Sequence, residues 1–146
     1  ALQPVAESCS PMRALSVCLA GLPVEVHVSP LDLVDAPAVL ADPALLARCL
    51  GLLVRRALVR GTGDEIGWDW SVEGDRVRLV MHRAADAGVE PEEFLRATPR
   101  TSDARAAGSG LEGALARGLA VLLGGTVSVD ERERRLLVEL RLPVAG

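Results

Sequence analysis

The segment whose residue types are best suited to chemistry consists of Gly108, Ser109, Gly110 and Leu111, which lead into a helical pattern. Backbone N–H groups at the start of a helix have no partner within the helix, and the helix dipole places partial positive charge there. Such a segment can therefore bind an anion such as phosphate. Glu112 follows directly, and its negative charge would repel such an anion. The glycines can also act only as a flexible hinge before the helix.

The cysteines and histidines do not form the pattern of a metal site or of a disulfide framework. Cys9, Cys18 and Cys49 are odd in number and widely spaced among apolar residues, so we expect inert thiols in a reducing, cytoplasmic setting. His27 and His82 lie in or beside strand patterns, outside the helical context of a phosphoacceptor histidine. The sequence also has no nucleophile elbow that would argue for a Ser-His-Asp triad.

Length and charge limit the remaining possibilities. A chain of 146 residues fits one domain, residues 1–146, and 49% hydrophobic with 25% charged residues is the balance of a globular protein. The net charge of −4 argues against nucleic-acid binding, which needs a basic surface. Apolar runs such as Leu119–Leu123 are far shorter than the ~20 residues of a membrane span, so we expect no membrane contact by this domain.

The first half of the chain predicts a lead-in helix, two strands and a longer helix. Residues 1–22 form the lead-in, and Val24–Val28 alternates apolar and polar residues as a half-buried strand does. A short strand is expected over Ala38–Ala41. Asp42-Pro43 is a helix N-cap signature, and the helix should continue to about Arg60. Its expected buried face comprises Leu45, Leu46, Cys49, Leu50, Leu53, Val54 and Ala57.

The second half predicts two hairpins that are separated by a long loop and a third helix. Residues 66–81 alternate as two strands around a Glu73-Gly74-Asp75 tip. Residues 83–110 lose this periodicity apart from a short helix at Pro91–Arg96, and we expect a lid-like loop of the kind that lines binding sites. The third helix is expected over Gly110–Leu123, with Leu111, Leu115, Leu119 and Leu122 as its stripe. The final hairpin comprises Thr126–Val129, the charged turn Asp130–Arg135 and Leu136–Leu142.

Together these elements predict an α/β (α+β) two-layer sandwich, in which a mixed sheet of about five to six strands is covered on one face by three helices. Three local patterns in this order resemble the Bergerat (GHKL) ATPase fold, and most closely the catalytic, ATP-binding domain of sensor histidine kinases. Residues 39–46 resemble the entry to that family's N-box helix, and residues 108–111 resemble the start of its G2 box. Residues 140–143, Leu-Arg-Leu-Pro, resemble its closing strand. The resemblance implies that the second and third helices lie side by side on one face of the sheet.

The resemblance also implies where a nucleotide would bind, and the matching residues are altered. The family's N-box asparagine, which helps to hold Mg²⁺, corresponds to Arg56, and a guanidinium has no lone pair for a metal. One turn earlier, Leu52 stands where the family has Asn or an acidic base. In the G1 box the family's Asp binds adenine. Aligning Asp86 and Gly88 with it leaves Glu90 at the second glycine, and the other alignment places Ala84 at the Asp.

The implied function is that of a histidine-kinase-like ATPase domain with little or no binding of ATP and Mg²⁺, which serves as a regulatory or docking module. Its expected partners are a response regulator or the dimerisation helices of a signalling protein. An alternative is the active ATP-binding domain of a divergent sensor kinase, a histidine protein kinase that would use Asp86 and residues 108–111. A second alternative is part of a histidine phosphotransferase, which would require a phosphoacceptor helix outside residues 1–22.

Overall fold

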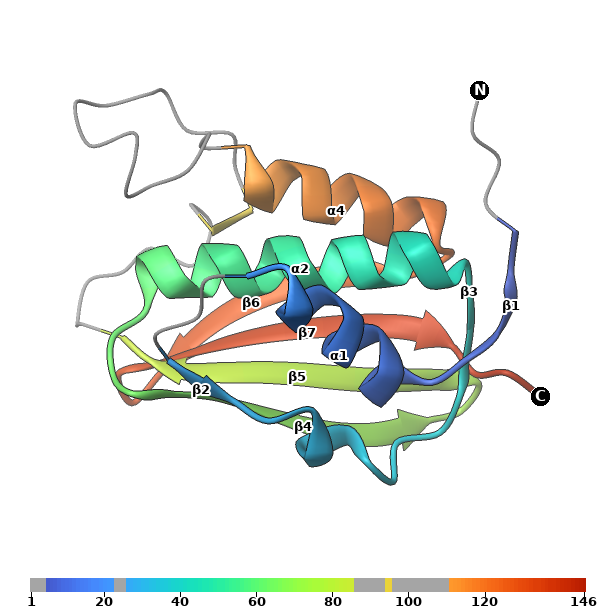
Figure 1. The fold of residues 1–146 in the computed structure, drawn as a ribbon, viewed down its shortest axis with the longest axis horizontal. Helices are drawn as coiled ribbons and strands as arrows, with labels where there is room; N and C mark the ends of the chain where they lie inside the picture. Colours follow the sequence, from blue (N-terminus) through green and yellow to red (C-terminus); the bar gives the residue numbers. More distant parts are fainter. Residues whose placement is uncertain (1–4, 23–25, 86–93, 96–110) are drawn as a thin grey trace.

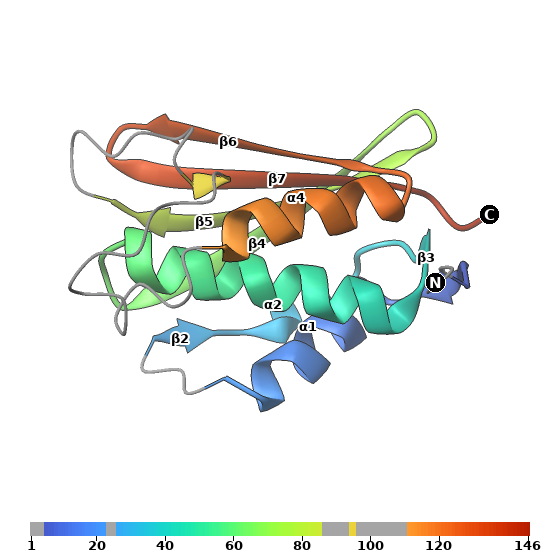
Figure 2. The same ribbon diagram turned by 90° about the horizontal axis from the view of Figure 1, so that it is seen from above.

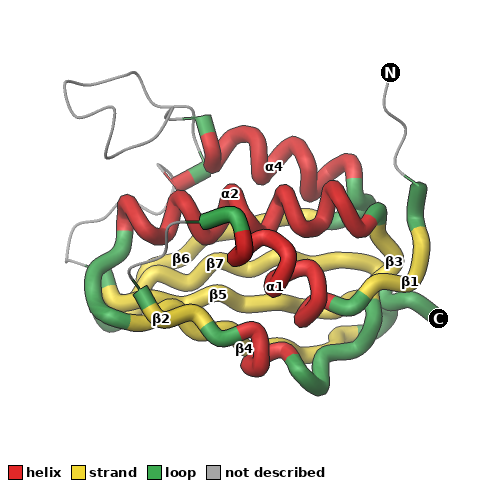
Figure 3. The backbone as a smooth tube through the Cα atoms, in the orientation of Figure 1, coloured by secondary structure: helices red, strands yellow, loops and turns green. Residues whose placement is uncertain are grey.

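The computed structural model describes residues 5–22, 26–85, 94–95 and 111–146 and shows two layers, with helices packed on one face of a sheet (Figures 1 and 3). This confirms the predicted α/β sandwich. The described elements, in chain order, are β1 (Glu7–Cys9), α1 (Pro11–Ala20), β2 (His27–Val28), the 3-10 helix η1 (Pro30–Leu33), β3 (Val39–Ala41), α2 (Pro43–Arg60), β4 (Glu65–Glu73), β5 (Arg76–Ala84), α4 (Glu112–Leu122), β6 (Thr126–Arg132) and β7 (Arg135–Pro143).

The main sheet of the described residues has five strands in the order β2-β4-β5-β7-β6. It is mixed, as predicted, because β2 runs parallel to β4 while the other neighbours are antiparallel. The expected strand over Ala38–Ala41 forms as β3, but it pairs with β1 in a separate two-stranded sheet. Of the predicted strand over Val24–Val28, His27 and Val28 form β2 and Val26 does not, while residues 24–25 lie outside the described residues.

Both predicted hairpins form. Gly74 at the first tip has φ +60°, a backbone conformation that glycine adopts readily. At the second tip the sequence prediction was wrong in extent, because residues 130–132 continue β6 and Arg135 begins β7. The turn is Glu133-Arg134, whose φ angles of 51° and 60° are those of a type I′ turn. That turn matches the right-handed twist of the two strands, so the strands can pair up to its edge.

Helix α2 begins where the sequence predicts. Asp42 Oδ1 accepts hydrogen bonds from the backbone N–H groups of Ala44 and Leu45 at 3.0 and 3.1 Å, which caps the helix start. Its apolar face is buried, apart from Leu45, which is half-buried. Arg56 is buried as well, which the periodicity did not predict. An arginine is almost never fully buried unless it is paired, so its surroundings are of interest.

Helix α4 buries a different face from the one predicted. Its buried residues are Glu112, Gly113, Ala116 and Ala120. Of the predicted stripe, Leu119 is half-buried against the core, whereas Leu111, Leu115 and Leu122 are exposed. The small residues let α4 lie close to α2, and Cys49 Sγ on α2 is 3.5 Å from the Ala116 carbonyl oxygen. Figure 2 shows α4 and α1 on opposite sides of α2, over the same face of the sheet. The expected side-by-side arrangement of α2 and α4 is therefore confirmed.

The core lies between the helices and the sheet, and aliphatic side chains from α2, β5 and β7 provide most of it. The other face of the sheet carries charged side chains that pair across strands. Glu139 of β7 accepts from Arg78 Nε at 2.6 Å and from Arg141 Nε at 2.7 Å. Among the described residues, no helix is both long and apolar enough to cross a membrane.

Candidate functional site

The candidate site lies between the middle of α2 and the start of α4, where Arg56 is the most deeply buried charged residue of the described chain. Its side chain is 1% exposed, and Nε donates a hydrogen bond to the Phe94 carbonyl oxygen at 3.0 Å. Phe94 is itself 1% exposed. A buried guanidinium gains stability when it donates to a backbone oxygen. Arg56 therefore ties α2 to the described residues that precede α4.

Gly113 brings the start of α4 against the same carbonyl group. A Cβ atom at this position would overlap the Phe94 carbonyl oxygen and crowd the backbone of Leu95. The absence of a side chain is therefore what lets α4 approach the Phe94 backbone. Arg56 from α2 and Gly113 from α4 converge on one carbonyl group and leave little space between the two helices at this point.

Glu112 is the first residue of α4 and is also buried, with 8% of its surface exposed. A carboxylate in the first turn of a helix is stabilised by the positive end of the helix dipole. The same dipole would otherwise attract a bound anion. Glu112 thus places the protein's own negative charge at the start of α4.

The structure describes two of the predicted nucleotide-binding residues, Arg56 and Leu111. Leu111 is 46% exposed and forms the N-cap of α4 without a side-chain cap. The other predicted site residues, Asp86, Gly88, Gly108, Ser109 and Gly110, lie outside the described residues.

Of the residues predicted as a lid-like loop, Arg83 and Ala84 belong instead to β5, while residues 86–93 and 96–110 lie outside the described residues. Arg83 is 6% exposed and donates from Nη1 to the Ala57 carbonyl oxygen at 2.6 Å and from Nη2 to the Gly63 carbonyl oxygen at 2.9 Å. It therefore binds the carboxyl end of α2, where the helix dipole favours a cation. Burial lowers the pKa of Arg83, and nearby Asp64 opposes this shift. Every second residue of β5 is buried, namely Val77, Leu79, Met81 and Arg83. The position of Arg83 in this alternating series is the sequence signal that could have predicted its burial.

The described residues do not form a divalent-cation site. They contain no cluster of three or more His, Cys, Asp or Glu side chains that could hold a metal ion. Leu52, one turn before Arg56 on α2, is a half-buried aliphatic side chain with no oxygen to offer. Mg²⁺ prefers several oxygen ligands, and a buried guanidinium nearby would repel it. The described part of the α2–α4 site therefore does not fit Mg²⁺.

Comparison with protein-family models and with curated proteins gives no match to the sequence. Comparison with solved structures does. The ATP binding domain of PrrB from Mycobacterium tuberculosis is 23% identical, with a TM-score of 0.62, and the match covers 98% of each chain. The catalytic domain of histidine kinase ThkA is 16% identical, with a TM-score of 0.69, over 97% of this chain and 99% of that chain. The fold is that of a histidine-kinase ATP-binding domain.

A third similar structure places the kinase-like fold within a longer protein. Full-length ShkA, solved in complex with AMPPNP, is 21% identical with a TM-score of 0.70. The match covers 100% of this chain and 32% of the ShkA chain. The structure places the Arg56 side chain between α2 and the backbone of Phe94.

Proposed function

We propose that this histidine-kinase-like domain binds Mg²⁺ and ATP weakly or not at all, and that it acts as a regulatory docking module in the cytoplasm. The observation that carries the proposal is the buried Arg56, which donates to Phe94 at the place where the resemblance expects a magnesium ligand. Glu112, buried at the α4 start, adds a negative charge where phosphates would bind. The positive charge of Arg56 would repel Mg²⁺, and the negative charge of Glu112 would repel the triphosphate.

The docking half of the proposal rests on the outward face of α4. Leu111, Leu115 and Leu122 are 46%, 46% and 57% exposed. Together with Gly118 they are spaced four, three and four residues apart, which is the spacing of contact residues in helices that pack by knobs into holes. We call Leu111, Leu115, Gly118 and Leu122 the α4 seam. A Cβ at Gly118 would meet no atom within 4 Å, so this position leaves a hole for a partner's side chain. We propose that the seam packs on the dimerisation helices of a signalling protein; a response regulator is the other partner considered.

Titration with a fluorescent ATP analogue, with and without Mg²⁺, tests the nucleotide half. We expect no magnesium-dependent binding at micromolar concentrations. Micromolar binding that requires Mg²⁺ would instead favour the alternative function, an active ATP-binding domain of a histidine kinase. That alternative is supported by the fold that this chain shares with ShkA, whose structure was solved with AMPPNP. Adding a dimerisation helix with labelled ATP would then show whether phosphoryl transfer occurs.

The docking half needs a separate measurement. A synthetic heptad peptide with leucine at its a and d positions is the probe, and binding is followed by fluorescence anisotropy. We expect Leu115→Asp to weaken binding at least tenfold, because it places a charge in the centre of the seam. Val59→Asp, on the exposed face of α2, is the matched control and should have no effect. Equal losses in both variants would show that α4 is not the docking face.

A further inference from the structure

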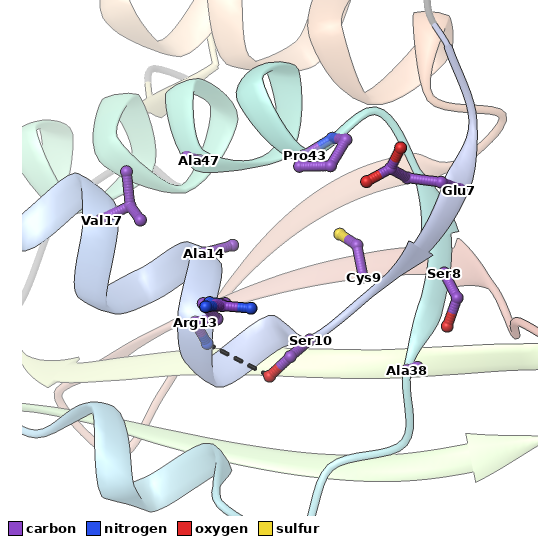
Figure 4. A pocket seen from close by; sticks show the side chains of 10 residues that line it. All are labelled: Glu7, Ser8, Cys9, Ser10, Arg13, Ala14, Val17, Ala38, Pro43 and Ala47. Atoms are coloured by element: carbon purple, nitrogen blue, oxygen red, sulfur yellow. Dashed lines mark hydrogen bonds between the residues drawn. The ribbon is translucent and has the colours of Figure 1, made fainter.

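A groove is lined mainly by residues of α1 and α2. Figure 2 shows α1 on the side of α2 away from α4. It consists of two adjoining hollows of about 560 and 380 Å³, which share Val17 and Ala47. The first hollow is bordered by β1, α1 and the start of α2, and Figure 4 shows Cys9 pointing into it from β1. The second continues along α2 past Gly51 to Arg55. The two hollows are therefore adjacent along α1 and α2, and we call them together the α1–α2 groove.

The floor of the groove is apolar and made of small side chains. Ala14 of α1 and Ala47 of α2 are 6% and 8% exposed, so they form the floor, while Val17 stands 61% exposed on the wall. At Gly51 a Cβ would come within 3.4 Å of Cys18 Cβ, so the missing side chain lets α1 cross close to α2. An exposed valine above a small-residue floor provides an apolar surface on which a partner's side chains can be buried.

The rim of the groove is basic. Arg13 of α1 lines the first hollow, and Arg48 and Arg55 of α2 line the second. All three are exposed, and none forms an ion pair with another described residue. Among the described lining residues of both hollows, Glu7 is the only one with a carboxylate, and it lies on β1 at the far end of the first hollow.

Several arginines on the outer face of the sheet are paired with carboxylates, unlike those of the groove. On the outer face of the sheet, Arg78 and Arg141 bind Glu139, and Arg132 binds Asp130 with Nε to Oδ2 at 2.7 Å. The protein as a whole carries a net charge of −4. Unpaired arginines gathered along one apolar groove of an acidic protein form a local positive surface, which attracts and orients a negatively charged partner.

We propose that the α1–α2 groove is a docking site for an acidic amphipathic helix of a partner protein. A helix with one apolar face fits the groove between two helices, and its flanking carboxylates would meet the arginines on the rim. Arg48 and Arg55 are seven residues apart, or about 10.5 Å along α2 at ~1.5 Å per residue. The partner therefore carries Asp or Glu at positions i and i+7 beside its apolar stripe.

This docking site is independent of the proposed function. Arg55 points into the groove, whereas its neighbour Arg56 is buried on the side that faces Phe94. The α4 seam lies on the far side of α2 (Figure 2). The acidic helix could therefore bind whether or not the domain binds ATP, and whether or not the α4 seam contacts dimerisation helices.

The test uses a designed helical peptide of about 14 residues, with leucine and alanine on one face and Glu at i and i+7. A second peptide, with Lys in place of each Glu, is the control. Binding to the whole chain is measured by fluorescence anisotropy at low and at physiological salt. We expect the acidic peptide to bind and the basic peptide not to bind, with affinity falling as salt rises. Equal binding of both peptides, or no binding of the acidic peptide, would overturn the proposal.

Matched variants locate the site. Arg48→Ser with Arg55→Ser should weaken binding of the acidic peptide roughly tenfold through loss of two rim pairs. Arg117→Ser with Arg134→Ser removes the same charge from exposed positions outside the groove and should have no effect. Val17→Ser should weaken binding without changing its salt dependence. Equal losses of peptide affinity in the two double variants would contradict the placement of the site in the α1–α2 groove. Binding of phosphatidylglycerol vesicles or single-stranded DNA in place of the acidic peptide would contradict the proposed partner.

Discussion

The Nε of Arg56 and the carbonyl oxygen of Phe94 are 3.0 Å apart in a part of the protein where both residues are 1% exposed. This hydrogen bond joins the middle of α2 to a residue that is distant in the sequence. The preceding residue on α2, Arg55, is exposed instead. The pair Arg55 and Arg56 therefore allows a direct comparison of an exposed and a buried arginine on the same helix.

Arg56→Met should destabilise the protein by about 2–3 kcal/mol, because it removes the donor to the Phe94 carbonyl and leaves a buried acceptor without this bond. Arg55→Met removes the same charge at an exposed position and should change stability by less than about 0.5 kcal/mol. Urea unfolding followed by circular dichroism measures both. Equal stability of the two variants would show that the buried bond contributes nothing.

Two glycines of α4 should respond to alanine in opposite directions. Gly113→Ala places a methyl group against the Phe94 carbonyl oxygen and should lower stability by more than about 1 kcal/mol. At Gly118 a Cβ meets no atom within 4 Å, and Gly118→Ala should raise stability by about 0.5–1 kcal/mol through the helix preference of alanine. Thermal melts of the two variants suffice, and stabilisation by Gly113→Ala would rule out the close approach of α4.

Glu139 should make stability depend on pH in the acid range. Burial alone raises the pKa of this carboxyl, but hydrogen bonds from Arg141 and Arg78 outweigh it and hold the pKa below its ordinary value. A depressed pKa contributes stability above the unfolded value of about 4.3, and the contribution disappears as pH falls through the folded value. We therefore expect Glu139→Gln to be less stable than wild type at pH 7 and the difference to shrink below about pH 4.

Glu133→Gln is the control for this measurement, since Glu133 is an exposed residue at the tip of the β6–β7 hairpin. It should leave the acid dependence of stability unchanged. Urea midpoints at a series of pH values compare the three proteins. A Glu139→Gln variant that loses stability in parallel with wild type as the pH falls would contradict the role of this carboxylate.

The cysteines should react slowly in the native protein. Burial raises the pKa of Cys18 to about 11 and that of Cys49 to about 12, so almost no thiolate is present at neutral pH. Burial, with a smaller effect of Glu7, also raises the pKa of Cys9. Iodoacetamide labelling at pH 8, followed by mass spectrometry, should proceed much more slowly in the folded protein than in urea. Rapid native labelling of Cys49 would mean that its surroundings open readily.

Local signals predicted the parts of the fold that depend on neighbouring residues. Asp42-Pro43 fixed the start of α2 because the carboxylate binds N–H groups two and three residues away. Gly74 marked a hairpin tip by the same kind of local chemistry. Helix α4 ends at Leu122, one residue before the predicted end at Leu123, and Gly124 with φ +77° follows its C-cap. Each of these predictions needs only the conformation of a few consecutive residues.

The errors concern interactions between distant segments. Leucines usually face a core, so the α4 stripe was assigned inward, but Ala116 and Ala120 face α2 because their small side chains let the helices approach closely. The pairing of β3 with β1 depends on a partner about thirty residues away, which periodicity does not encode. Arg56 was identified only by its match to the family's N-box asparagine, and no local pattern marks the Phe94 carbonyl as its partner.

Strand β3 has a mechanical consequence. It holds β1 on one side, while Val39 bridges to Val144 and the N–H of Ala145 donates to the Ala38 carbonyl oxygen at 3.0 Å. Both chain ends are thus fastened to one short strand, and Figure 1 shows them leaving the domain at the same end. A force that pulls the ends apart would load these few hydrogen bonds first, one after another, and would reach the long central strands only after the short strand had peeled away.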